Sequence, residues 1–221
     1  MSRIEFHRHL AALQDELLTL GKMVDDAMVR SMEGLTKRDL ALSEQVVRDD
    51  DLIDRKRFRL EEQSIQLLAT QQPAADDLRI LVAVLHIAVE LERMGDYAEG
   101  ISKISLMLGS EPWSTPVQGL EEMAAKAIDM LRRSLDTLVR RDTEGALQVC
   151  QSDDEVDAIY DRVVHDLMVY MTEEPQAIHR TTLLLWVAHD LERIADRATN
   201  VAERVVFLVT GKMIETNTSR Y

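Results

Sequence analysis

The chain has 221 residues, a length that allows one or two domains with a sizeable core. Its formal net charge is −14, so it lacks the surplus of lysine and arginine that would neutralise nucleic-acid phosphates or capture free phosphate in a basic pocket. It has only four prolines, eight glycines and 4% aromatic residues. This composition, rich in leucine, alanine and glutamate, predicts an all-α protein, and its acidity allows the binding of cations.

Cysteine usage and hydropathy limit the cellular setting. Cys150 is the single cysteine, which excludes an internal disulfide and a thiolate metal cluster. The first residues carry no apolar segment of the signal-peptide type. No stretch approaches the roughly 20 apolar residues that cross a bilayer. We therefore expect a soluble, cytoplasmic protein that meets a membrane only through its partners.

The first half predicts three long helices, over about residues 5–37, 42–70 and 74–108. Pro73 precedes the third of these, at a point where the chain must turn, because proline begins helices well and continues them badly. Gly109 follows as a C-terminal stop. Residues 111–116 contain two prolines and small polar residues, and form the one good linker in the chain.

The second half repeats the first. An offset of 103 residues matches Asp26, Ser31, Arg38 and Asp39 with Asp129, Ser134, Arg141 and Asp142. An offset of 100 residues matches Glu92 and Asp96 with Glu192 and Asp196. Pro73 likewise has its counterpart in Pro175, and Gly109 in Gly211. This alignment predicts internal duplication: a three-helix unit over residues 1–110, a second over residues 117–212, and a tail over residues 213–221. The expected fold is two tandem three-helix bundles related by a pseudo-twofold, with the bundles forming separate units and Trp113 and Trp186 packed inside.

Carboxylates form the most informative part of the repeat. Residues 90–96 read ELERMGD and residues 190–196 read DLERIAD, so each copy places Glu and Asp four residues apart on one helix face. Glu92, Asp96 and Glu99 continue an apolar stripe of the third helix, and Glu192 and Asp196 do so in the sixth. Asp50 with Asp54, and Asp153 with Asp157, complement them from the second and fifth helices. The pattern predicts two acidic clusters, one in each bundle.

Spacing alone leaves two interpretations open. With 40 acidic residues, about seven i,i+4 acidic pairs arise by chance, and nearby arginines such as Arg57 and Arg193 can neutralise them as surface ion pairs. Metal binding is the other interpretation, since packed carboxylates repel one another unless a cation lies between them. All-oxygen donors favour Mg²⁺, Mn²⁺ or Ca²⁺ and also admit iron, whereas zinc prefers histidine or cysteine. His86 and His189 do not occupy matching repeat positions, so we do not expect them to be ligands.

Beyond the acidic segments 90–96 and 190–196, further features of the chain are residues 197–211, the Gln72-Pro73 turn and the Asp77-Leu78-Arg79 start of the third helix. Together these features closely resemble the PhoU family of phosphate-signalling regulators. The resemblance covers nearly the whole chain. It implies metal clusters, of iron or zinc, held by the pairs Asp50/Asp54, Glu92/Asp96, Asp153/Asp157 and Glu192/Asp196. Glu99, on the same helix face as Glu92 and Asp96, is a further candidate ligand. Thr199 stands where the first repeat has Glu99, so the two clusters are expected to differ in metal number or affinity.

The resemblance also implies a function without catalysis. Proteins of this family are regarded as negative regulators that connect the ATPase subunit of a phosphate transporter to a membrane sensor histidine kinase, and we expect a homodimer. No Walker loop, His-Glu-x-x-His or Gly-x-Ser-x-Gly motif is present. Two alternatives remain: a di-iron carboxylate enzyme, although no Glu is followed by His three residues later, and a helical adaptor without metal.

Overall fold

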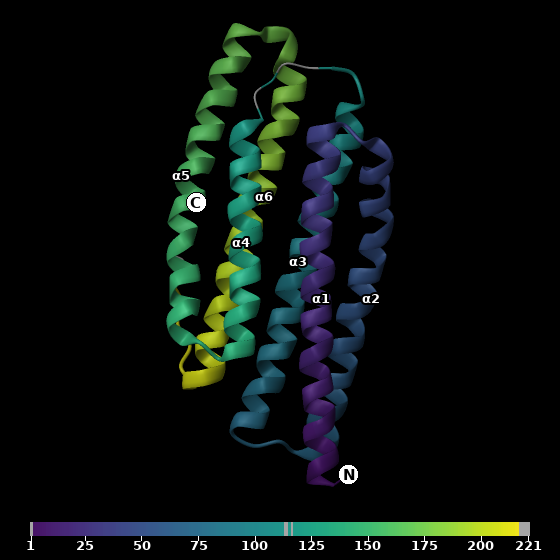
Figure 1. The fold of residues 1–221 in the computed structure, drawn as a ribbon, viewed down its shortest axis with the longest axis vertical. Coiled ribbons are helices and arrows are strands. Elements are labelled where there is room, and N and C mark those ends of the chain that lie inside the picture. The colour runs from purple at the N-terminus through teal and green to yellow at the C-terminus, as the bar shows by residue number, and fades with distance from the viewer. Residues whose placement is uncertain (1, 113–114, 116, 217–221) are drawn as a thin grey trace.

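The computed structural model describes residues 2–112, 115 and 117–216, and its described part is helical without a strand (Figure 1). The all-α prediction is confirmed. No described helix combines the length and the apolar character that a membrane span needs. The elements are α1 (Arg3–Lys37), α2 (Leu40–Gln71), α3 (Asp76–Leu108), α4 (Gln118–Arg140), α5 (Thr143–Glu173), a 3₁₀ turn (Pro175–Ala177) and α6 (Ile178–Thr210).

Local capping sets the starts of the first two helices. Ser2 and Glu5 form a capping box, so α1 begins two residues before the predicted position. α2 also begins two residues early, because the Asp39 side chain accepts a hydrogen bond from the Leu42 N–H at 3.0 Å.

The turn at Pro73 is present, but α3 begins two residues later than predicted. Gln72 and Ala75 adopt positive φ angles of 46° and 48°, which keeps the intervening residues out of the helix. At the C-terminal ends of α3 and α6, Gly109 and Gly211 take φ angles of 73° and 72°, and both are the predicted stops.

The duplication is visible in details of the backbone. Arg38 and Arg141 end α1 and α4 in the left-handed conformation, with φ angles of 57° and 54°. Asp39 and Asp142 then cap α2 and α5 through side-chain hydrogen bonds of 3.0 Å. Equivalent residues thus make the same turn in each half, which is the behaviour that the repeat predicted.

The two halves lie side by side, with α3 and α6 packed against each other and α2 and α5 on the outer sides (Figure 1). α1 also contacts α4. Buried side chains of both halves form one continuous hydrophobic core. The Glu90 carboxylate of α3 accepts hydrogen bonds from Arg197 Nη1 at 3.2 Å and Asn200 Nδ2 at 3.0 Å, both on α6. The expectation of separate bundles is therefore wrong, because apolar packing and polar contacts join them.

Three further expectations concern the segment between the two repeats, Trp186 and the tail. The boundaries set at residues 110 and 117 fall between α3 and α4, although Trp113 lies outside the described residues. Trp186 was expected to pack inside, but it is 57% exposed and makes an edge contact with His189. In the tail, residues 213–216 are not helical and run back along α6.

Candidate metal centre

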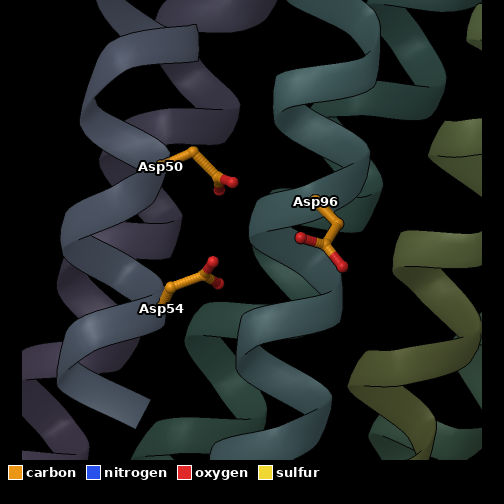
Figure 2. A group of neighbouring side chains, drawn as sticks. All are labelled: Asp50, Asp54 and Asp96. Atoms are coloured by element: carbon orange, nitrogen blue, oxygen red, sulfur yellow. The ribbon is translucent and has the colours of Figure 1, made fainter. Parts of the chain in front are cut away.

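Three aspartates of the first repeat meet between α2 and α3. Asp50 and Asp54 lie one turn apart on α2, and Asp96 approaches them from α3 (Figure 2). One carboxylate oxygen from each lies within 4.8 Å of the others. Within residues 2–112, 115 and 117–216, these three form the one group with such spacing. We call Asp50, Asp54 and Asp96 the first acidic centre.

Gly95 allows the two helices to approach closely at this centre. A Cβ atom there would lie 3.1 Å from two methyl carbons of Ile53 and 3.3 Å from Asp50 Oδ1. Glycine costs a helix interior about 1 kcal/mol relative to alanine. Its presence beside Asp96 is explained by the space that the centre requires. The equivalent residue of the second repeat is Ala195, which is fully buried.

The electrostatics of the first acidic centre favour a cation. Burial, followed by the negative charges of Glu99, Asp96 and Asp54, raises the pKa of Asp50 from 3.8 to about 7. Asp96 lies at the exposed rim of the centre, where partial desolvation and the charges of Glu92, Asp54 and Glu99 raise its pKa to about 6. Asp50 Oδ1 is buried and has no hydrogen-bond partner within the described structure. A bound cation would satisfy this oxygen and relieve the repulsion.

Glu92 and Glu99 flank the centre rather than join the three aspartates. Glu92 accepts a hydrogen bond from Arg57 Nη2 of α2 at 3.2 Å, and Glu99 pairs with Lys103 at 2.6 Å. The ion-pair interpretation therefore fits these two glutamates. Both still act on the centre through charge, since Glu92 raises the pKa of Asp96 and Glu99 raises the pKa of Asp50 and of Asp96.

The second repeat gathers acidic side chains in a looser arrangement, which we call the second acidic centre: Asp153, Asp157, Glu192 and Asp196. Asp153 is buried, with 7% of its surface exposed. Burial, with the charges of Asp196, Asp157 and Glu192, raises its pKa to about 7. Burial and Asp196 also raise the pKa of Glu192 to about 7. The carboxylates thus influence one another, but among the described residues their oxygens do not converge as those of the first acidic centre do.

The surroundings of the second acidic centre explain part of this difference. Arg193 Nη1 donates to Asp196 at 3.2 Å, and the position of Glu99 is occupied by the buried Thr199. His189 Nδ1 lies 3.9 Å from Glu192 Oε2. The sequence predicted no ligand role for His189, because the first repeat has no matching histidine. The three-residue spacing from Glu192 was the signal that places it on this face.

The chemistry of the donors fits a metal ion at the first acidic centre. Three carboxylates from two helices supply hard oxygen ligands, and one buried oxygen lacks a partner. Such donors suit Mg²⁺, Mn²⁺ or iron, and can hold zinc with lower preference.

The fold and this site define a class: all-helical tandem-repeat proteins with acidic centres between the second and third helices of a repeat. The PhoU domain model matches the chain twice, at residues 17–105 and 120–205, which confirms the duplication. The chain belongs to the PhoU family.

Curated relatives and solved structures agree with this membership. The chain is 37% identical to a phosphate-specific transport system accessory protein PhoU homologue of Clostridium acetobutylicum, over 98% of this chain and all of the relative. A homologue of Rhizobium meliloti is 34% identical over 93% of this chain and 87% of its own. The crystal structure of PhoU from Pseudomonas aeruginosa superposes with a TM-score of 0.89 at 33% identity, covering 94% of this chain and all of that one.

Proposed function

We propose that this protein is a negative regulator of phosphate uptake and of the phosphate-starvation response. It acts in the cytoplasm by contact with the ATPase subunit of a phosphate transporter and with a sensor histidine kinase, and it forms a homodimer. The observation that carries this proposal is the 37% identity, over 98% of the chain, to a protein named as an accessory of phosphate-specific transport. A PhoU structure from Streptococcus pneumoniae, 27% identical with a TM-score of 0.89, is described as a phosphate transport system regulatory protein.

Metal ions belong to this proposal as structural elements of the regulator. Asp50, Asp54 and Asp96 would hold an ion in the first acidic centre, with Glu92 and Glu99 beside it. The ion would neutralise the mutual repulsion of these carboxylates and fix α2 against α3. The surface that α2 and α3 offer to a partner would then depend on metal binding.

A reporter experiment tests the regulatory assignment. Deletion of the gene should leave a phosphate-starvation reporter active in phosphate-rich medium, because the kinase is no longer restrained. A deletion strain with normal repression and no second copy of the gene would remove the assignment.

The metal is tested separately by elemental analysis of protein purified without chelator or histidine tag. Replacing Glu92 and Asp96 by alanine should empty the first acidic centre and leave the metal of the second. A matched control is Glu121→Ala on α4, which removes an exposed carboxylate that lies outside both centres. Metal content that is unchanged in a variant lacking Glu92, Asp96, Glu192 and Asp196 would refute metal binding and favour the metal-free adaptor.

A further inference from the structure

The tail after α6 makes three anchoring contacts, and we call residues 213–216 the C-terminal strap. The backbone N–H and the hydroxyl of Thr216 both donate to Glu203 Oε1, at 2.6 and 2.9 Å. Met213 Sδ accepts a hydrogen bond from Arg204 Nη1 at 3.0 Å. Ile214 packs against the hydrophobic core. Two polar contacts and one apolar contact thus hold a short non-helical segment against α6.

Cys150 of α5 lies beside the end of the strap, close enough for the Thr216 side chain to act on its thiol. It is a buried free cysteine, 9% exposed, and its Sγ lies 4.0 Å from the Thr199 carbonyl oxygen of α6. Burial raises the pKa of its thiol, and a hydrogen bond with the Thr216 side chain partly offsets that rise. A covered, protonated thiol reacts slowly.

Cys150 and Thr199 also lie at one end of the second acidic centre. Cys150 precedes Asp153 by three residues on α5, and the negative charges of Glu203 and Asp153 raise the pKa of its thiol. Thr199 follows Asp196 by three residues on α6, and its Oγ1 is buried without a hydrogen-bond partner in the described structure. The strap therefore lies at an end of the second acidic centre where one hydroxyl remains unsatisfied.

The first repeat closes the same end differently. Lys103 stands at the position of Glu203 and pairs with Glu99, which stands at the position of Thr199. That closure is made by two neighbouring residues of one helix and needs no other segment. In the second repeat the closure depends on chain that follows the repeat, and such a segment can leave while every helix stays folded.

We propose that the C-terminal strap is a removable cover over this end of the second acidic centre, and that it controls access of reagents and ions to Cys150 and the adjacent carboxylates. The control of ion access rests on the proposed metal-binding function, whereas the protection of the thiol does not. Few contacts hold the strap, so it opens far more often than the protein unfolds.

Alkylation of Cys150 tests the cover directly, because the chain has one cysteine and all label reports on it. Iodoacetamide labelling of the full chain, in chelator and at constant pH, would be followed by mass spectrometry. Glu203→Ala removes the acceptor of both Thr216 hydrogen bonds, and Ile214→Ser removes the apolar anchor. Each should accelerate alkylation about tenfold, which is the order of effect expected for losing a hydrogen bond to a charged group in Glu203→Ala and for losing a partly buried apolar side chain in Ile214→Ser.

The matched control is Glu215→Ala, which makes the same charge change at an exposed residue of the strap. Its alkylation rate should equal that of the unmodified chain. An unchanged rate in Ile214→Ser would overturn the proposal, because Glu203→Ala also removes a negative charge that raises the pKa of the Cys150 thiol and can speed alkylation for that reason alone. Faster alkylation that follows an equal loss of helix stability in thermal melts would also overturn it, since the protection would then come from the helices.

A second experiment measures ion access. In a chain carrying Asp50→Ala and Asp96→Ala, uptake of Co²⁺ followed by its absorbance reports on the second acidic centre. Adding Ile214→Ser should speed this uptake about tenfold by the same reasoning. Equal uptake rates would overturn the control of ion access by the strap. No uptake in either protein would instead refute metal binding at this centre, and the alkylation result would still decide whether the strap covers Cys150.

Discussion

Replacing Asp50 by asparagine should stabilise the metal-free protein at pH 8 and destabilise it relative to the unmodified chain when metal is present. The folded protein raises the pKa of Asp50 from 3.8 to about 7. The folded carboxyl therefore holds its proton at pH values where the unfolded one has lost it, and stability falls as pH rises from about 4 to about 7. Asparagine keeps the shape of the side chain and removes this penalty.

The shift of about three pKa units sets an upper bound of about 4 kcal/mol. Asp50 is only partly buried and solvent screens its charge, so we expect about 1–2 kcal/mol at pH 8. For a protein of this length, each kcal/mol corresponds to about 2–4 °C in Tm. The expected increase is therefore about 2–8 °C at pH 8, and it should shrink towards pH 4.

Thermal melts in chelator from pH 4 to pH 8 measure this effect, with Asp51→Asn as the control. Asp51 is exposed on the same helix, so its replacement changes the charge equally outside the first acidic centre. With metal at about 100 Kd, the unmodified chain should gain about 2.7 kcal/mol, and Asp50→Asn should lose most of that gain. Equal melting temperatures of Asp50→Asn and Asp51→Asn at every pH in chelator would refute the electrostatic account.

Further predictions concern helix spacing, the contact between bundles and metal removal. Gly95→Val should lower the metal affinity of the first acidic centre without changing a ligand, because the valine side chain would push Ile53 and α2 away from α3. Titration of metal-free protein with Co²⁺ measures this affinity, and an unaltered affinity would show that the helix spacing is unimportant. Arg197→Ala leaves the half-buried Glu90 without its charged partner and should cost about 1–3 kcal/mol in chemical denaturation, whereas a loss near zero would mean that solvent satisfies Glu90. Addition of a chelator to protein purified with its metal should lower Tm, and an unchanged Tm would favour ion-paired helix faces.

Much of this structure can be predicted from the sequence, because many of the signals are local. Helix ends follow from residues a few positions apart, as at Asp39 and Asp142, and the same is true of the turn at Pro73. The repeat identified the acidic pairs, since residues four apart on a helix share a face whatever else they contact. The late start of α3 was not predicted, because Gln72 and Ala75 adopt positive φ angles that are usually taken by glycine or asparagine.

Which of the acidic residues meet depends on how the helices pack, and this could not be predicted from the sequence. The position of α2 against α3 depends on the close approach at Gly95. It brings Asp96 near Asp50 and Asp54, and it lets Glu92 form an ion pair with Arg57. The helical period places a carboxylate on a face, but it does not fix how far a neighbouring helix lies or how it is shifted along its axis. The continuous core shared by both bundles and the contact of Thr216 with Glu203 are likewise non-local. They depend on packing between distant parts of the chain, which no short-range pattern in the sequence encodes.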